Sequence, residues 1–360
     1  MAKVTFNNKT SPFFDALREK IDAYFKEQEI KPTGNFKLYS KTIILVSAAV
    51  LVYSLLVFSN IPVWGSILLC ALMGLTFASI GFNVMHDGAH GSYSNNKTIN
   101  NLMSYSLNLM GGSSFMWKVK HNHVHHSFTN IEGVDDDIDI KPWMRVNEQQ
   151  KRYWFHRFQH VYSFLLYGAT YFMWIWWMDF QKYFTRRIGP TPIRKMKFSE
   201  HVGFWLTKIL YLALFIGLPI YFKGVAYTLI GYSIILFVTG VTIAVVFQLA
   251  HVVEDTHFPE PNQQTQKIEE EWALHQIHTT ANFATNNKLV SWFMGGLNFQ
   301  VEHHLFPKIS HIHYPAISKL VRETCHEFNV RYIEYPTVMD AIAAHIRHLR
   351  NLGQPIPVRS

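Results

Sequence analysis

Charge-free apolar runs alternate with polar, histidine-bearing stretches along this chain. Residues 42–59, 61–85 and 225–250 contain no charged side chain, and 204–222 contains only Lys208. A helix needs about 20 apolar residues to cross about 30 Å of hydrocarbon. The pattern therefore predicts four transmembrane helices, at about 42–60, 62–85, 204–222 and 225–250.

A very short turn separates the two helices of each predicted pair. Residues 60–62 connect the first pair, and Lys223 with Gly224 connects the second. Turns this short join antiparallel neighbours, so we expect two transmembrane hairpins. The expected fold is an all-α integral membrane protein, with the polar regions forming a cytoplasmic helical cap.

Two further patterns predict helices at the membrane surface. In an N-terminal arm, residues 1–40, apolar side chains recur at Phe14, Leu17, Ile21 and Phe25, which indicates an amphipathic helix. Residues 160–178 are apolar but rich in tyrosine and tryptophan, as is typical of the membrane–water interface. We expect both helices to be interfacial. The first lies before a main domain of 41–320, and the second lies within it. A cytoplasmic C-terminal tail, 321–360, is expected to follow.

The distribution of basic residues predicts the orientation. The two outer turns together hold only Lys223, whereas the arm, the central region and the tail hold nearly all other lysines and arginines. Short loops rich in lysine and arginine stay in the cytoplasm. Both termini and every histidine cluster are therefore expected on the cytoplasmic side of the membrane.

The composition favours a membrane protein over a soluble one. Charged residues make up 16% of the 360 residues, against roughly 25% in a typical soluble domain. The net charge of +8 suits anionic lipid headgroups. A nucleic-acid partner is not indicated, because the sequence has no basic stripe interleaved with aromatic residues. Cys70 lies in an apolar run and Cys325 near the C-terminus, so no disulfide is expected. The polar N-terminus predicts no cleavable signal peptide.

Histidines gather in three clusters, and a further one, His251, ends the fourth apolar run. The clusters are His86 and His90; His121, His123, His125 and His126; and His303 and His304, preceded by Gln300. A spacing of four places two side chains on one helix face, one turn apart. Imidazole is the commonest metal ligand, and its repetition at one membrane face predicts a metal centre.

Eight of these histidines are enough for two metal ions, because one ion needs about three or four protein ligands. The expected ligands are His86, His90, His121, His125, His126, His251, His303 and His304. The clusters contain no cysteine, which argues against structural zinc and iron–sulfur centres. Iron or copper that reacts with dioxygen fits an all-imidazole site, and spacing alone leaves catalytic zinc open.

Other polar side chains are weaker candidates. Gln300, His123, Glu254 and Asp255 could bind a metal or orient its ligands, and Trp117 and Lys118 could meet a substrate headgroup. The acidic run Asp135, Asp136, Asp137 and Asp139 is expected to orient imidazoles, cap a helix or meet a basic carrier. A surface or interfacial place is expected for the remaining histidines considered, which are His156, His160, His201, His257, His275, His278, His311 and His313.

The clusters resemble the histidine boxes of the integral-membrane fatty acid desaturases. That family carries His-x-x-x-His, then His-x-x(-x)-His-His, then His-or-Gln-x-x-His-His, around two hairpins. The flanks are also similar: Trp117-Lys118-Val119-Lys120 precedes the second box, Thr129-Asn130 follows it, and Leu305-Phe306-Pro307 follows the third. The resemblance covers about residues 40 to 320, and related membrane hydroxylases share the plan.

The resemblance implies a chemistry and a set of partners. It implies two iron ions, with His251 among the ligands, which activate dioxygen with two electrons from a separate carrier. Hydrogens leave two neighbouring methylenes of an acyl chain, giving a double bond and water. The substrate would be an acyl-CoA or the acyl chain of a lipid in the bilayer.

Gln300 resembles the first position of the third box in front-end desaturases, which act between an existing double bond and the carboxyl end. Eukaryotic front-end enzymes usually carry a fused cytochrome b5 domain with a His-Pro-Gly-Gly motif, which this sequence lacks. The closest resemblance is thus to a bacterial, linoleoyl-CoA-desaturase-like subgroup. The donor would be a separate ferredoxin or cytochrome b5-like protein, and the expected location is the bacterial inner membrane, or the endoplasmic reticulum in a eukaryote.

Two alternatives remain at this point. A membrane di-iron hydroxylase of acyl chains, alkanes or ring lipids could use the same scaffold. A non-catalytic metal-binding or transport protein is the alternative of another class. A transporter places polar residues midway through its spans, whereas the polar residues here lie mainly at the ends of the runs, with Gln248 and His251 near the inner boundary.

Overall fold

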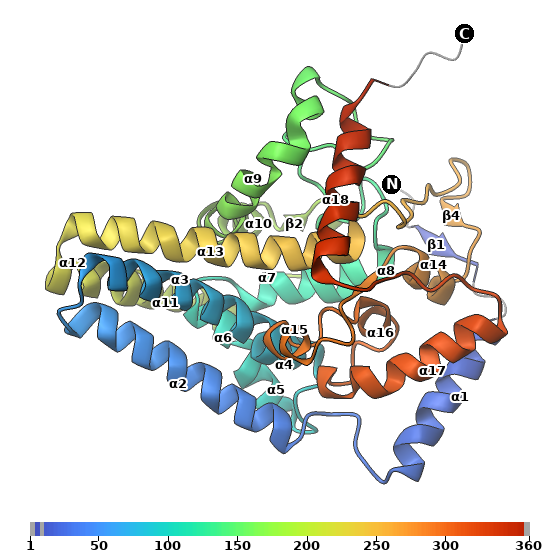
Figure 1. The fold of residues 1–360 in the computed structure, drawn as a ribbon, viewed down its shortest axis with the longest axis horizontal. Coiled ribbons are helices and arrows are strands. Elements are labelled where there is room, and N and C mark those ends of the chain that lie inside the picture. The colour runs from blue at the N-terminus through green and yellow to red at the C-terminus, as the bar shows by residue number, and fades with distance from the viewer. Residues whose placement is uncertain (1–3, 8–10, 356–360) are drawn as a thin grey trace.

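The computed structural model describes residues 4–7 and 11–355, and helices dominate it (Figure 1). Outside the candidate spans, the α-helices are α1 (Pro12–Glu27), α5 (Lys97–Ser104), α6 (Ser106–Leu109), α7 (Ser114–Lys118), α8 (His126–Phe128), α9 (Gln159–Met173), α10 (Asp179–Thr185), α14 (Trp272–His278), α15 (Lys288–Phe293), α16 (Gln300–Leu305), α17 (Tyr314–Glu327) and α18 (Val338–Gly353). Shorter helical turns are η2 (Val119–His125) and η4 (Trp174–Met178), both π-helical, and η3 (Trp154–Phe158) and η6 (His311–His313), both 3-10.

Among the described residues, four helices are long and apolar enough to cross a membrane, as the sequence predicts. They are α2 (Phe36–Phe58); α3 (Val63–Ile80) with η1 (Gly81–Met85) and α4 (His86–His90); α11 (Phe198–Leu212) with η5 (Ala213–Gly217) and α12 (Leu218–Lys223); and α13 (Val225–His251). The first begins six residues before the predicted position. Its earlier start follows from Asn35, whose side-chain oxygen accepts a hydrogen bond from the backbone N–H of Lys37 and caps the helix.

Large apolar side chains cover the outside of these helices. Ile43 of α2 is 67% exposed, Trp64 of α3 is 70% exposed and Tyr221 of α12 is 82% exposed. Exposed apolar surface on this scale is rare in soluble monomers and is the outer surface expected in a bilayer. The chain is therefore an integral membrane protein.

The α3–α4 helix occupies the centre of the packing. In its most apolar stretch 67% of the residues are buried, against 17% in α11–α12. It packs along α2 on one side and along α13 on the other, while α11 contacts α6 and its continuation α12 contacts α13 and α2. The histidines at the end of α3–α4 are thus carried by the most enclosed of the four helices.

Helix α9 crosses α13 obliquely, and small residues permit the close approach (Figure 1). A Cβ at Gly240 would lie 2.6 Å from the backbone oxygen of Tyr167, and one at Gly168 would lie 2.1 Å from the Phe237 ring. Glycine on both helices lets the two backbones touch. The sequence placed a surface helix at 160–178, and the helical segment α9–η4–α10 occupies Gln159–Thr185.

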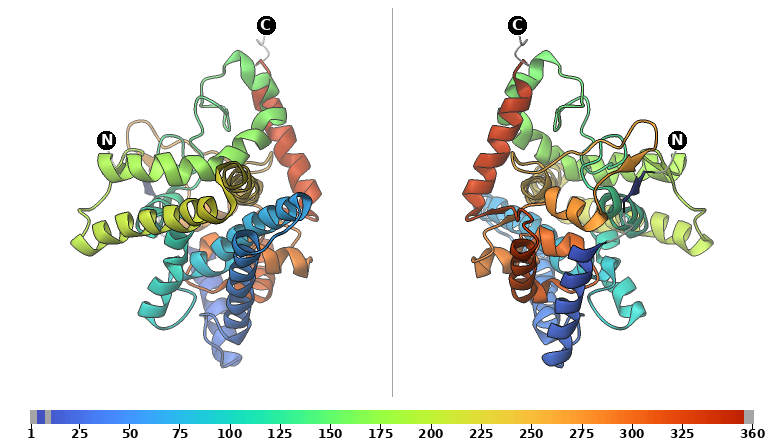
Figure 2. Two further views of the ribbon diagram at one scale, coloured as in Figure 1. Left: turned by 90° about the vertical axis from the view of Figure 1, so that its left-hand side faces the viewer. Right: turned by 90° about the vertical axis from the view of Figure 1, so that its right-hand side faces the viewer.

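The first and last helices, α1 and α18, are part of the folded body. The apolar face of α1, with Phe13, Leu17, Ile21 and Phe25, is buried against protein, chiefly α17 and α14. Helix α18 packs on α9 and η3. In Figure 2 the red C-terminal helix lies beside the green segment that contains them. The expectation of an interfacial N-terminal helix is therefore wrong, because the same apolar stripe finds a protein partner. The structure also has no boundary at 320, since α17 runs through it.

Three two-stranded sheets add to the expected all-α architecture. Strands β1 (Thr5–Phe6) and β4 (Lys267–Ile268) pair in parallel, as do β5 (Asn282–Phe283) and β6 (Glu334–Tyr335). Strands β2 (Arg187–Ile188) and β3 (Thr191–Pro192) form an antiparallel hairpin. The two parallel pairs connect segments far apart in the sequence, and both secure the terminal regions to the part of the molecule that carries the histidines.

Candidate metal centre

The eight predicted histidines come together in one buried cluster. One group contains His86, His90, His121 and His303; a second contains His125, His251 and His304; a third contains His126, His303 and His304; and a fourth contains His121, His125 and Asp137. Within each group, one potential ligand atom per residue lies within 4.8 Å of the others. Four separate segments, α4, η2–α8, the end of α13 and α16, thus meet at one place (Figure 1).

The first pair of histidines lies on α4, as predicted. The rings of His86 and His90 are 4.6 Å apart, one helical turn from each other. Between them, Gly88 faces α5 so closely that a Cβ there would lie 2.7 Å from the backbone nitrogen of Ser104. The glycine lets α5 pack behind the pair and hold it in place.

The second box forms a π-helix rather than the α-helix that its spacing predicts. Residues Val119–His125 have the wider π turn, in which side chains five apart meet. The Nε2 atoms of His121 and His126 therefore lie 3.2 Å from each other. Single π turns occur frequently at functional sites, and this one brings three histidines of one segment to the same cluster.

Buried imidazole nitrogens in the cluster lack hydrogen-bond partners within the described part of the chain. They are His90 Nε2, His125 Nε2, His126 Nδ1, His303 Nε2 and His304 Nε2. Leaving a buried polar atom unpaired costs about 1–3 kcal/mol. So many unpaired nitrogens directed at one region fit a site for metal ions, which would satisfy them all.

Acceptors hold the Nδ1 atoms of three rings in the cluster. His125 Nδ1–H donates to Asp135 Oδ2 at 2.9 Å, His304 Nδ1–H donates to Gln276 Oε1 at 2.8 Å, and His251 Nδ1–H donates to the carbonyl oxygen of Thr279 at 3.2 Å. These three oxygens have no hydrogen to offer, so each Nδ1 must carry one. Each Nε2 is then left with a lone pair, which is the form that binds a metal.

A hydroxyl orients one more ring. Tyr314 is fully buried, and its Oη lies 3.1 Å from His303 Nδ1. Of these orienting groups, the sequence indicated the acidic run that contains Asp135. It gave no sign of Gln276 or Tyr314, which reach the cluster from α14 and α17 only through the tertiary fold.

Burial keeps most of the cluster uncharged. Burial, followed by the neighbouring imidazoles, lowers the pKa of His126, His303 and His304 well below the usual value for histidine. Burial also lowers the pKa of His121 to about 4. Burial opposes the charge on His125 as well, but the Asp135 carboxylate outweighs it and raises the pKa of that ring. Neutral imidazoles are ready to bind a metal without releasing a proton.

A chain of charges leads away from the cluster. Asp137 lies 3.9 Å from both His121 and His125, and Lys120 Nζ contacts Asp137 at 2.7 Å. Asp136 in turn contacts Lys182 Nζ of α10 at 3.1 Å. Asp136 and Asp137 of the acidic run thus pair with lysines on two different elements. These ion pairs link η2 to α10.

Aromatic rings enclose the cluster. The indole of Trp117 stacks on His121 with ring centres 4.3 Å apart, and Phe247 of α13 contacts both His125 and His251. Lys118, the residue after Trp117, donates from Nζ to Asn101 Oδ1 at 3.3 Å. Trp117 therefore borders the histidines, whereas the ammonium group of Lys118 is directed to α5.

Three of the weaker candidates, His123, Glu254 and Asp255, belong to none of the four groups. His123 is exposed, Glu254 pairs with Arg347, and Asp255 pairs with Arg331 and accepts a hydrogen bond from Tyr335. Gln300 is buried, and its Nε2 donates to the carbonyl oxygen of Leu297 at 2.8 Å. The two acidic residues bind C-terminal segments instead of orienting imidazoles.

Four histidines that the sequence placed at the surface are buried. They are His156, His275, His311 and His313. His311 pairs through Nδ1 with Asp87 at 3.0 Å and lies 3.2 Å through Nε2 from Lys41 Nζ. The expectation was wrong because segments far apart in the sequence pack on these residues. Terminal elements cover three of them, with Phe6 on His275, Phe25 of α1 on His313 and α18 on η3 with His156, while His311 lies between Asp87 and Lys41.

Comparisons with known proteins agree with this geometry. The family model described as fatty acid desaturase matches residues 62–336. The sn-1 linoleoyl-lipid 6-desaturase of Synechocystis sp. is 36% identical over 98% of both chains. The acyl-lipid (8-3)-desaturase of Physcomitrium patens is 38% identical, covering 95% of this chain and 72% of its own, and the sn-1 linoleoyl-lipid 6-desaturase of Arthrospira platensis is 34% identical over 98% and 95%. The three boxes, their assembly into one buried cluster and these similarities lead to one conclusion: the chain belongs to the fatty acid desaturase family.

Proposed function

We propose that this enzyme introduces a cis double bond into the acyl chain of a membrane lipid, at a centre of two iron ions. The observation that carries the proposal is the set of buried, unpaired imidazole nitrogens directed at one region. One ion would be held by His86, His90, His121 and His303, and the other by His125, His251 and His304. His126 groups with both His303 and His304 and would lie between the two.

The chain's own residues prepare this site for chemistry with dioxygen. When bound, the two irons supply dioxygen activation and the removal of one hydrogen from each of two neighbouring methylenes. Asp135, Gln276 and the Thr279 carbonyl fix the orientation of three rings. Trp117 and Phe247 exclude water beside the ligands, which protects a reactive site from side reactions.

Buried apolar side chains beside the first box suit an acyl substrate. Met85, Ala89 and Leu107 form a buried cluster against which Trp117 and Trp174 pack. An acyl chain has no polar handle at its reacting carbons, so its position must come from apolar contact. The relatives are named as acyl-lipid enzymes, which supports a lipid-bound acyl chain over acyl-CoA.

We further propose front-end regiochemistry. Gln300 begins the third box in place of histidine, and relatives carry the names 6-desaturase and (8-3)-desaturase. The new double bond would then form between an existing double bond and the carboxyl end. Two electrons would come from a separate ferredoxin or cytochrome b5-like donor.

The proposed topology has two transmembrane hairpins, with the histidines and both termini in the cytoplasm. Contacts of α2 with α3 and of α12 with α13 support the two pairs, and the basic residues outside the spans support the orientation. The cytoplasmic helices and loops would form a cap over the metal site. We place the protein in the bacterial inner membrane, or in the endoplasmic reticulum if it is eukaryotic.

Expression in a host that makes no polyunsaturated lipids tests the function. With added linoleate, we expect a new fatty acid with one more double bond on the carboxyl side of the existing ones. His125→Ala and His304→Ala should each abolish it, because each removes a ring from the buried cluster. His123→Ala is the matched control, since His123 is exposed in the same box, and it should keep the activity.

Two results would contradict the proposal. Unchanged fatty acid profiles in both His125→Ala and His304→Ala would reject catalysis at these boxes. Hydroxy-lipids without new double bonds would make the chain a hydroxylase on the same scaffold.

A further inference from the structure

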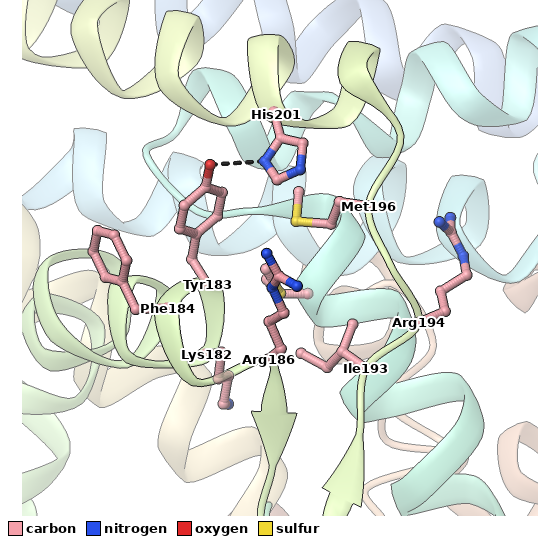
Figure 3. A pocket seen from close by; sticks show the side chains of 9 residues that line it. Lys182, Tyr183, Phe184, Arg186, Ile193, Arg194, Met196 and His201 are labelled. Atoms are coloured by element: carbon pink, nitrogen blue, oxygen red, sulfur yellow. Dashed lines mark hydrogen bonds between the residues drawn. The ribbon is translucent and has the colours of Figure 1, made fainter.

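A cavity of about 120 Å³ lies beside α10, away from the histidine cluster (Figure 3). Lys182, Arg186, Arg194 and His201 line it, together with the rings of Tyr183 and Phe184. One water needs roughly 10–15 Å³ of such space, so the cavity can hold a group the size of a phosphate. Its lining brings three permanent cations to one small space.

The charges around this cavity do not cancel. Lys182 is paired with Asp136 at 3.1 Å, and Arg194 binds Glu200 with Nη1–Oε2 at 2.9 Å. Arg186 has no carboxylate partner in the described part of the chain, and Figure 3 shows its guanidinium group directed into the cavity. One guanidinium is thus left free to bind an anion.

Two further hydrogen-bonding groups complete the lining. Tyr183 Oη and His201 Nδ1 are 2.7 Å apart, across the cavity from Arg186. The backbone places Arg186 there because it follows α10 in the left-handed conformation, with φ 53°. The side chain therefore turns away from the axis of α10, toward the start of α11.

The cavity lies where the protein leaves the membrane. His201 belongs to the first part of α11, a candidate span. Two exposed aromatic rings belong to the same region: Phe184, which lines the cavity, is 69% exposed, and Phe198, the first residue of α11, is 83% exposed. Exposed aromatic residues gather at the membrane–water interface, the depth of the lipid headgroups. A ligand at this position would have its polar group in the cavity and its apolar part in the bilayer.

The cavity is also connected to the metal centre. Met116 lines it, and the next residue, Trp117, stacks on His121. Lys182 belongs to the chain of charges that runs through Asp136, Lys120 and Asp137 to the histidines. An amphiphile held here would lie against the helix that leads into the second box.

We propose that this cavity binds the phosphate ester of an amphiphile, with Arg186 as the main contact. A guanidinium group binds phosphate oxygens through two parallel hydrogen bonds. With His201 Nδ1–H and Trp205 Nε1–H both donating to its oxygen, the Tyr183 hydroxyl keeps its hydrogen for a third. A glycerophospholipid headgroup and the phosphates of coenzyme A share this chemistry. The proposal concerns binding alone, so it can fail while desaturation is confirmed, and the reverse.

Ligand-dependent thermal stability of the purified full-length protein in detergent tests the proposal. The probes are phosphatidylglycerol, an uncharged galactosyl diacylglycerol with the same acyl chains, coenzyme A, and inorganic phosphate. We expect phosphatidylglycerol to raise the melting temperature and the galactolipid to have no effect through this site. Arg186→Gln should weaken the binding of phosphatidylglycerol about tenfold or more, because the charge-assisted hydrogen bonds to the phosphate are lost.

Arg187→Gln is the matched control. It removes the same charge one position away, and Arg187 donates to the Pro190 carbonyl oxygen instead of lining the cavity. Arg186→Lys keeps the charge and loses the paired hydrogen bonds, so its affinity should fall between those of the wild type and Arg186→Gln. It also serves as the second variant if Arg186→Gln proves unstable.

The outcomes separate the sources of the phosphate. Arg186-dependent binding of phosphatidylglycerol identifies a membrane lipid as the ligand, and Arg186-dependent binding of coenzyme A alone identifies a thioester carrier. Equal affinity of wild type and Arg186→Gln for every probe would overturn the proposal. It would also be overturned if the galactolipid bound as tightly as phosphatidylglycerol, or if Arg187→Gln weakened binding as much as Arg186→Gln.

Discussion

The side chains behind the histidines decide which ring nitrogen faces the cluster. Asp135 is the most constrained of them, because its carboxylate also accepts hydrogen bonds from the backbone N–H groups of Asn130 and Asp137, at 3.0 Å each. All three of its partners are donors. The residue therefore orients His125 and at the same time shapes the loop that follows the second box.

Replacing Asp135 by asparagine should weaken metal binding. The amide has one oxygen and one NH₂ group, so a donor would face a donor, and the charge that supports His125 would be lost. Changes of this kind typically cost about 10–100-fold in metal affinity or activity. Metal analysis of the purified protein, with the fatty acid profile, measures the effect. Asp139→Asn is the control, since Asp139 pairs with Lys141 at the surface, and equal iron content in both variants would contradict the assigned role.

Among the elements, the terminal helices and the π turns shape the site. The turn η2 gathers His121, His125 and His126 in a way that an α-helix would not. Helix α1 carries no residue of the cluster, yet it packs on α14 and α17, which supply Gln276 and Tyr314. Its apolar face is thus a structural support for groups that orient two rings of the histidine cluster.

Leu17→Ala should destabilise the protein strongly. Leu17 is fully buried between α1 and its neighbours, and such a truncation costs about 2–5 kcal/mol. Leu51→Ala is the matched control, because Leu51 is 60% exposed on α2 and lipid can fill the space it leaves. Thermal unfolding in detergent compares them. Equal melting temperatures of the two variants would show that α1 does not pack on the rest of the protein. That result would instead fit a helix at the membrane surface.

For the whole molecule, the N-terminal strand β1 and the C-terminal strand β6 both return to the side that carries the histidines. Strand β1 pairs with β4, and β6 pairs with β5. At the far end, Lys223 Nζ donates to the carbonyl oxygen of Ser59 at 2.7 Å, which joins the two short turns. The molecule is thus held together at both ends of its long helices.

Labelling with a membrane-impermeant thiol reagent tests this arrangement. A cysteine introduced at the exposed Asn60 should react in intact cells, and one at the exposed Gln263 should react only after permeabilisation. The native Cys70 and Cys325 are buried, so the unsubstituted protein is the blank. The reverse pattern would invert the topology, and labelling of both positions in intact cells would refute a single-sided cap.

The order of the histidine boxes and the four apolar runs could be predicted from the sequence because both are local. Each box lies within six consecutive positions, and a charge-free run of about 20 residues has few other uses. The buried state of His275 and His311 could not be predicted, because the pattern around a lone histidine in a polar stretch predicts a surface residue. The same holds for α1, whose apolar stripe fits a membrane surface as well as a protein surface.

The sequence alone determined the family, the histidines that form the cluster and the number of candidate spans, since these depend on residue identity and short-range spacing. Only the tertiary structure decided which histidines share a group, which acceptor orients each ring and where the terminal helices dock. Those features depend on contacts between segments far apart in the chain, such as Gln276 with His304 and Tyr314 with His303. The cavity at Arg186 belongs with them, because it exists only where α10, α11 and the segment before the second box come together.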